Sequence, residues 1–89
     1  MATRIYGLIW DEWNKHHIAR HGISVAEVEE VCHGNHRAVV SYRKRILIEG
    51  KTKRGKYLII ALSPEDRNLQ PYGKGIYYPV TAFDKEVKE

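Results

Sequence analysis

The hydrophobic pattern of the chain changes its period near residue 36, and this change restricts the fold more than any other feature. Before it, apolar residues recur at helical spacing in two segments, 11–21 and 24–33. After it, β-branched and aromatic residues fill four segments typical of strands, which are 36–42, 45–52, 56–63 and 75–83. A further strand is expected at 4–9. The pattern predicts an α+β domain of order β-α-α-β-β-β-β, with an antiparallel sheet of four to five strands and two N-terminal helices on one face.

Capping residues define the ends of both helices. Asp11 can cap the start of the first helix, and Gly22 suits the left-handed conformation that ends it. Ser24 with Glu27 three residues later forms a capping box for the second helix, and Gly34 is its stop. We therefore expect two short helices joined by a tight turn.

The strand region also carries turn signals. Residues 53–55 read as a hairpin tip, and residues 64–75 form a polar loop. Pro79 removes a backbone donor, which predicts a bulge or an edge position in the last strand. The residues that we expect in the core are Trp10, Ile18, Val28, Val39, Ile48, Ile59 and Val80.

Size and composition exclude several classes of protein. With 89 residues, 43% of them hydrophobic and 29% charged, the chain predicts one small domain over 1–89. A single cysteine, Cys32, excludes an intramolecular disulfide, and no apolar run is long enough to span a membrane. No signal-peptide pattern opens the chain, so we expect a cytoplasmic protein.

Positive charge is concentrated in the middle of the chain. Residues 37–63 contain eight basic side chains and one acidic side chain, a net charge of +7, whereas residues 1–36 carry −2 and residues 64–89 carry −1. Such a segment can hold a polyanion by electrostatic attraction. The alternative is a solvated basic sheet edge, because lysines there discourage aggregation of strands.

The first helix has an unusual polar stripe. A helical wheel gathers on one face Trp10, Trp13, Asn14, His17, Ile18 and His21. Three interpretations are open: a catalytic or ligand-binding cluster, histidines bonded to backbone at the edge of the core, or a metal site. Zinc would need more ligands than His17 and His21, and the chain has neither an HExxH pattern nor paired cysteines. We therefore expect no metal ion.

Three stretches carry motifs that together match one known family. They are "IWDEWNKHHIARHGISVAEVEEV" at 9–31, "RILIEGKTKRGKYLIIA" at 45–61 and "YYPVTA" at 77–82. The matching positions are Trp10, Asp11, His21, Gly22, Ile23, Glu27, Glu30, Val31, Arg45, Gly50, Thr52, Gly55, Lys56, Val80, Thr81 and Ala82. In these motifs the chain resembles the BrnT-type toxins, small RelE-like proteins of bacterial type II toxin–antitoxin systems.

The resemblance implies a toxin that cleaves RNA without metal or cofactor and is inhibited by an acidic antitoxin encoded nearby. The free protein is then expected to be a monomer or a weak dimer. His17 and His21 are candidates for proton transfer, and Arg45 is a candidate for binding the scissile phosphate. The candidate RNA-binding residues are Lys53, Arg54, Lys56 and Tyr57.

One departure from the family pattern concerns the end of the last strand. The family usually has an arginine directly after the Thr-Ala pair, where this chain has Phe83. That arginine would stabilise charge on a phosphate in the transition state. The alternative function is therefore a catalytically degenerate relative that binds nucleic acid or a partner protein.

Overall fold

The computed structural model describes residues 5–34, 36–42, 45–66, 68 and 70–85, with the backbone alone for 39–42. Its elements are β1 (Gly7–Leu8), α1 (Glu12–Arg20), α2 (Val25–His33), β2 (Arg37–Tyr42), β3 (Arg45–Lys51), β4 (Tyr57–Ser63) and β5 (Ile76–Asp84). The α+β class and the sequence of elements along the chain are as expected. None of the helices in these ranges is long and apolar enough to cross a membrane.

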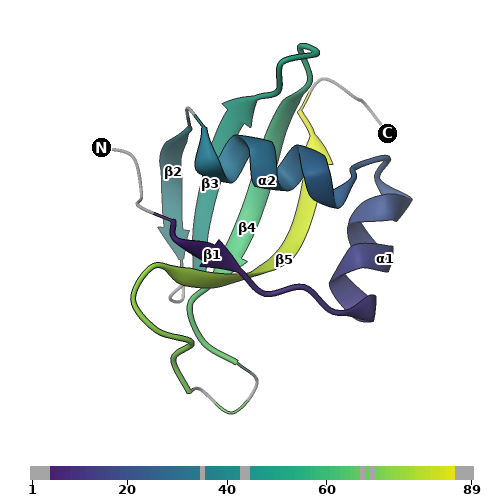
Figure 1. The fold of residues 1–89 in the computed structure, drawn as a ribbon. Helices are drawn as coiled ribbons and strands as arrows, with labels where there is room; N and C mark the ends of the chain where they lie inside the picture. The colour runs from purple at the N-terminus through teal and green to yellow at the C-terminus, as the bar shows by residue number, and fades with distance from the viewer. Residues whose placement is uncertain (1–4, 35, 43–44, 67, 69, 86–89) are drawn as a thin grey trace.

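The five strands form one curled mixed sheet in the order β1-β5-β4-β3-β2. Strands β2 to β5 pair antiparallel, whereas β1 runs parallel to the start of β5. The expectation of a wholly antiparallel sheet was therefore wrong at β1. The reason is visible in Figure 1, where the curl of β5 carries its first residues past the end of β4 to β1. Pairing between two segments so distant in sequence leaves no local signal.

Both helices begin with the predicted caps. The Asp11 carboxylate accepts a hydrogen bond from the backbone N–H of Asn14 at 2.9 Å, and the Asn14 side-chain oxygen accepts one from Asp11 N–H at 2.9 Å. Ser24 and Glu27 form the same reciprocal pair at the start of α2. Gly22 ends the turn after α1 with φ of 75°, a conformation that costs glycine little. The tight turn between the helices is confirmed.

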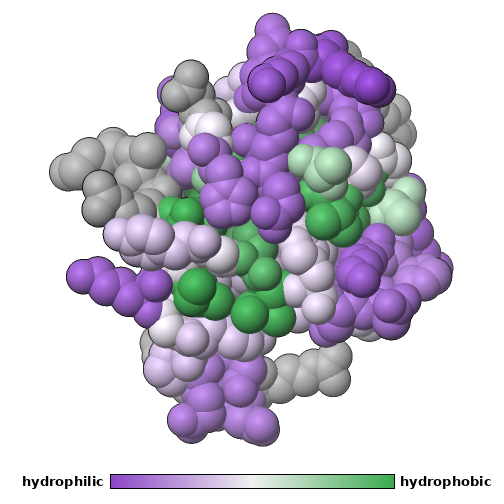
Figure 2. All heavy atoms as spheres, viewed as in Figure 1, coloured by the Kyte–Doolittle hydropathy of each residue, from purple (hydrophilic) through white to green (hydrophobic). Residues whose placement is uncertain are grey.

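The hydrophobic core lies between the sheet and the two helices, on a single face of the sheet. Ile18 of α1 and Val28 of α2 are buried in one cluster with Ile48, Ile60 and Ala82 from the three central strands. Trp10 packs at the edge of that cluster. Seen from the helix side, hydrophobic residues reach the surface between α2 and β1, while α1 and the β3–β4 hairpin are hydrophilic (Figure 2).

Two of the expected core residues are not in the core. Ile59 is half-buried and points away from the helices, because its neighbours Leu58 and Ile60 are fully buried in the core and side chains alternate along a strand. Val80 is half-buried at a bulge, where the pairing of β5 with β4 shifts register. The bulge expected from Pro79 is thus confirmed. The side chain of Val39 lies outside the described residues.

Asn14 is the polar residue that joins three parts of the fold. Its side chain is fully buried, and its amide nitrogen donates to the carbonyl of Ile9 at 3.0 Å and to the carbonyl of Pro79 at 3.1 Å. Its oxygen is occupied by the Asp11 N–H described above. The carbonyls of Gly75 and Tyr77 accept hydrogen bonds from the segment around β1. Asn14 therefore supplies the next hydrogen bond along this edge of β5, to Pro79, after those that the β1 segment makes to Gly75 and Tyr77.

Replacing Asn14 by alanine should destabilise the protein, because one buried carbonyl, one part-buried carbonyl and one cap N–H lose their partner. We expect the free energy of unfolding to fall by about 2 to 3 kcal/mol. Urea denaturation followed by circular dichroism measures it. Asn68→Ala is the matched control, since Asn68 is exposed. Equal effects of the two substitutions would show that the buried amide does not hold the fold together.

Candidate functional site

The face of the sheet opposite the helices gathers the charged side chains of the strands. Ile46 and Ile48 contact the core, so by the alternation of a strand the residues between and beside them point the other way. The same reasoning applies to β4 and β5, where Ile60 and Ala82 are buried. We call this surface the open face; its residues are Arg37, Arg45, Leu47, Glu49, Lys51, Tyr57, Ile59, Ala61, Thr81, Phe83 and Lys85.

The open face is strongly basic. Among its described residues, Arg37, Arg45, Lys51 and Lys85 are cations, and Glu49 is the only acid. The predicted basic segment 37–63 supplies three of these cations, and the fourth comes from the end of β5. A surface of this composition attracts polyanions and holds them through several contacts.

Glu49 forms the centre of a polar cluster on the open face. Its Oε1 accepts a hydrogen bond from Arg37 Nε at 2.7 Å and another from the Tyr57 hydroxyl at 2.7 Å. Its Oε2 lies 3.5 Å from Lys85 Nζ, which also sits 5.0 Å from the centre of the Tyr57 ring. The Glu49 side chain is only 3% exposed, although Arg37 and Lys85 are largely exposed. Glu49 is thus covered by its own partners and not by the core.

The pairing of the strands places these four side chains together. Arg37 of β2 lies directly opposite Glu49 of β3, and Tyr57 of β4 lies one step along, opposite Lys51. A backbone hydrogen bond of 2.7 Å from Lys85 N–H to the Tyr57 carbonyl continues the pairing of β5 with β4. Strands β2, β3 and β4 and the residue that follows β5 therefore contribute one group each, so the cluster forms only when the sheet is assembled.

The cluster stabilises the charged form of Glu49. The hydrogen bond from the Tyr57 hydroxyl, followed by that from Arg37, holds the pKa of Glu49 below its ordinary value. The same bond to Glu49 raises the pKa of Tyr57, so the phenol keeps its proton. The site thus holds an ionised carboxylate, a protonated hydroxyl and two cations within contact distance. These are the kinds of group that can accept a proton, donate one and bind a phosphate.

Two of the candidates from the sequence lie on the open face. Tyr57 belongs to the cluster itself, as a partner of Glu49 rather than as an isolated stacking surface. Arg45 is exposed on the same face of β3 as Glu49, four residues away and therefore at about 13 Å along the strand. Arg45 can contact the same extended ligand as the cluster, but not the same phosphate.

The histidines predicted for proton transfer lie on the other side of the molecule. His17 stacks on Trp13 with ring centres 4.9 Å apart, and His21 meets His17 edge-on at 5.6 Å. Both belong to the α1 segment, which packs on the core side of the sheet. The structure therefore does not bring His17 and His21 together with Arg45. No group of three potential metal ligands occurs among the residues that the structure describes.

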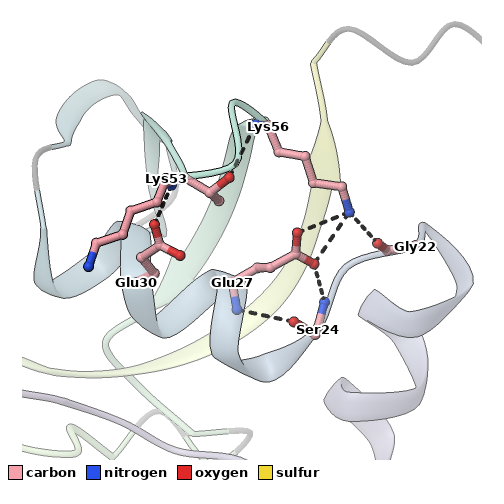
Figure 3. A network of polar contacts seen from close by, with 7 residues as sticks. Gly22, Ser24, Glu27, Glu30, Lys53 and Lys56 are labelled. Atoms are coloured by element: carbon pink, nitrogen blue, oxygen red, sulfur yellow. Dashed lines mark hydrogen bonds and ion pairs between the residues drawn. The ribbon is translucent and has the colours of Figure 1, made fainter.

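The cations of the β3–β4 hairpin divide into two kinds. Lys56 Nζ donates to the carbonyl of Gly22 at 2.8 Å and lies 3.0 Å from Glu27, while the backbone N–H of Lys53 donates to Glu30 (Figure 3). Lys56 thus fastens the hairpin to α2. The side chains of Lys53 and Arg54 are exposed at the tip.

The network around Lys56 also acts on Glu27. Burial alone would raise the pKa of Glu27, but hydrogen bonds from the Ser24 backbone and from Lys56 outweigh it and lower that pKa. Glu27 is therefore ionised when it binds Lys56. Of the four predicted RNA-binding residues, Lys56 is the one whose charge is already matched within the protein.

The helical wheel misplaced one residue of α1. Trp13 was expected to face inward, yet half of it is exposed, because Asn14 and Ile18 occupy the buried stripe. An open groove of about 520 Å³ runs along this side of the helix, lined by Glu12, Trp13, His16, His17 and Arg20. All five belong to one helix, whose surface is convex, so the groove is shallow and does not enclose a ligand.

Three residues of the cluster were not among the candidates from the sequence: Arg37, Glu49 and Lys85. A signal for Glu49 was present, since it is the one acid in the basic segment 37–63. It also lies an even number of residues from Arg45 and Lys51 in "RILIEGK", which places all three side chains on the same face of a strand. Lys85 could not be assigned to the same face, because the bulge in β5 changes the parity of its last residues.

Comparisons of the chain with models of protein families, with curated proteins and with solved structures gave no match.

The lowered pKa of Glu49 makes a prediction about acid stability. A carboxylate whose pKa is depressed by folding stabilises the native state above its unfolded pKa of roughly 4.3, and this contribution is lost as the pH falls through the native pKa. Glu49→Gln should therefore destabilise the protein at about pH 7 and have less effect near about pH 3. Urea unfolding at a series of pH values tests this.

Glu12→Gln is the matched control, because 86% of the Glu12 side chain is exposed and its ion pairs are long. A pH-independent difference between wild type and Glu49→Gln would contradict the charged state assigned to Glu49.

Proposed function

We propose that the chain is a metal-independent endoribonuclease whose active centre is the Glu49 cluster on the open face. The observation that carries this proposal is one ionised carboxylate in direct contact with an arginine, a lysine and a tyrosine hydroxyl. Cleavage of RNA by its own 2′-hydroxyl needs a base, cations around the phosphate and an acid for the leaving oxygen. The cluster contains a candidate for each role.

The reaction runs through transfer of two protons. Glu49 takes the proton of the 2′-hydroxyl, the 2′-oxygen bonds to phosphorus, and the bond from phosphorus to the 5′-oxygen breaks. The departing 5′-oxygen takes a proton from the Lys85 ammonium or the Tyr57 hydroxyl. The products are a 2′,3′-cyclic phosphate and a 5′-hydroxyl end. Arg37 and Lys85 stabilise the charge that develops on the phosphate oxygens.

The geometry of Glu49 suits this role. Both short hydrogen bonds reach Oε1, whereas Oε2 has only the contact of 3.5 Å with Lys85 among the described residues. Oε2 is therefore the oxygen that a 2′-hydroxyl can reach once the half-exposed Lys85 side chain moves aside, because the Glu49 side chain itself is only 3% exposed. The Arg37 side chain is 72% exposed, so it can turn from Glu49 to a phosphate at little cost in packing.

The biological setting of the proposal comes from the family resemblance. A BrnT-type, RelE-like toxin would act in the cytoplasm and would be inhibited by an acidic antitoxin. The basic open face is the surface that such an antitoxin would cover, because the acidic residues of the antitoxin would pair with the four cations of the face. In this proposal the free chain is a monomer or a weak dimer.

One observation favours a second function, that of a nucleic-acid or partner-binding module. Glu49 is almost completely covered by its partners, so the cluster can also serve as a neutralised network that only stiffens the sheet. The open face would then bind a polyanion through Arg45, Lys51 and Lys85 without cleaving it. Loss of the arginine expected at Phe83 agrees with this alternative.

Purified protein should cleave single-stranded RNA in the presence of a chelator and leave 2′,3′-cyclic phosphate ends. Glu49→Gln should lower the rate about 100-fold or more, the usual contribution of a general base. Gel analysis of an end-labelled RNA measures the rate, and Glu12→Gln is the control that should remain active. RNA binding without cleavage by the wild type would leave only the binding module.

The pH dependence and two histidine variants test whether Glu49 is the base. If Glu49 is the base, the rate should fall only below about pH 4.3. His17→Ala and His21→Ala should then leave the rate unchanged. A rate that is abolished by either histidine substitution would return the active centre to α1.

A further inference from the structure

An exposed aromatic ring lies beside the Glu49 cluster on the open face. Phe83 of β5 is 40% exposed. It lies directly opposite Ile59 of β4, and Ile59 lies directly opposite Glu49 of β3. Neighbouring strands are about 4.8 Å apart, so Phe83 is about 10 Å from Glu49 across the sheet. One row of side chains thus joins an apolar platform to the cluster.

The charges around this platform indicate what covers it. Lys85 follows Phe83 by two residues on the same face and reaches Glu49 at 3.5 Å. Arg37 closes the other end of the row, opposite Glu49. Arg37 and Lys85 contact Glu49 yet remain 72% and 51% exposed, so an apolar protein surface would bury their charges, whereas a nucleotide presents a flat ring at one end and a phosphate at the other. The combination of ring and cations is complementary to single-stranded nucleic acid.

We propose that Phe83 and Ile59 form a stacking subsite for one nucleobase of the bound RNA, next to the phosphate held by Arg37 and Lys85. This inference rests on the proposed function for the class of substrate, and it adds a residue that positions the substrate. The ring stacks on the base and takes no part in proton transfer. Because Phe83 and Ile59 offer no hydrogen-bonding atoms in their side chains, the subsite selects by ring area, and purines bind better than pyrimidines.

The test uses the full chain and a probe that cannot be cleaved. A fluorescent 2′-deoxyadenosine oligonucleotide lacks the attacking hydroxyl, and a matched abasic oligonucleotide keeps the phosphates but has no bases. Fluorescence anisotropy measures both affinities. We expect the wild type to bind the base-bearing probe more tightly, and Phe83→Ala to weaken that binding about tenfold while leaving the abasic probe unaffected.

Two further variants complete the experiment. Phe83→Tyr should retain the affinity of the wild type, and Phe83→Leu keeps apolar bulk for folding but should lose the preference for bases. Trp13→Ala is the matched control, because Trp13 is equally an exposed aromatic residue but lies on α1. It should bind both probes as the wild type does.

Each other result overturns the subsite. Equal losses on both probes would mean that Phe83 only maintains the sheet. No loss on either probe would mean that the Phe83 ring binds no base and is instead available to a partner protein. The outcome is independent of the proposed enzyme: base-dependent binding without RNA cleavage supports the subsite on a binding module, and cleavage without base-dependent binding supports the enzyme alone.

Discussion

The buried amide of Asn14 is the interaction on which the arrangement of the sheet depends. Strand β1 is only two residues long, so it cannot by itself hold the outer edge of β5. Asn14 continues that edge from α1 by donating to Pro79, and its second donor and its oxygen fix the chain that enters the helix. Burying an amide is tolerable only because each of its groups is bonded. The position of β5, and of Phe83 and Lys85 on it, follows from this contact.

The bulge beside Pro79 decides which residues of β5 reach the open face. Pro79 and Ala82 both face the core, although they are three residues apart, because one extra residue is accommodated between them. In a regular strand Phe83 would share the face of Pro79 and point into the core. With the bulge, Phe83 and Lys85 reach the open face. A backbone irregularity in one strand therefore completes a cluster whose other members come from β2, β3 and β4.

The sequence predicted where the helices, strands and turns lie better than which side of the sheet each strand residue faces. The Asp11 cap, the capping box of Ser24 and Glu27 and the turn at Gly55 are local chemistry, and the structure has them where they were expected. The segment "YLIIAL" is apolar at every position, so nothing in it shows whether Ile59 or Ile60 is buried. The pairing of β1 with β5 and the parity change in β5 depend on contacts between distant segments. For these reasons Tyr57 and Arg45 were found as candidates, whereas Arg37, Glu49 and Lys85 were not.

Because side chains alternate along a strand, the cations of the basic segment 37–63 do not all lie on one surface. Its charge of +7 is not one patch, because the hairpin at its centre turns toward α2, where Glu27 neutralises Lys56. Strands β2 and β3 direct Arg37, Arg45 and Lys51 to the opposite surface. Lys85 joins them from a segment with a net negative charge. The local field that a phosphate would meet is therefore set by which face each strand presents and by the single carboxylate of Glu49, and counting charges along the chain cannot locate it.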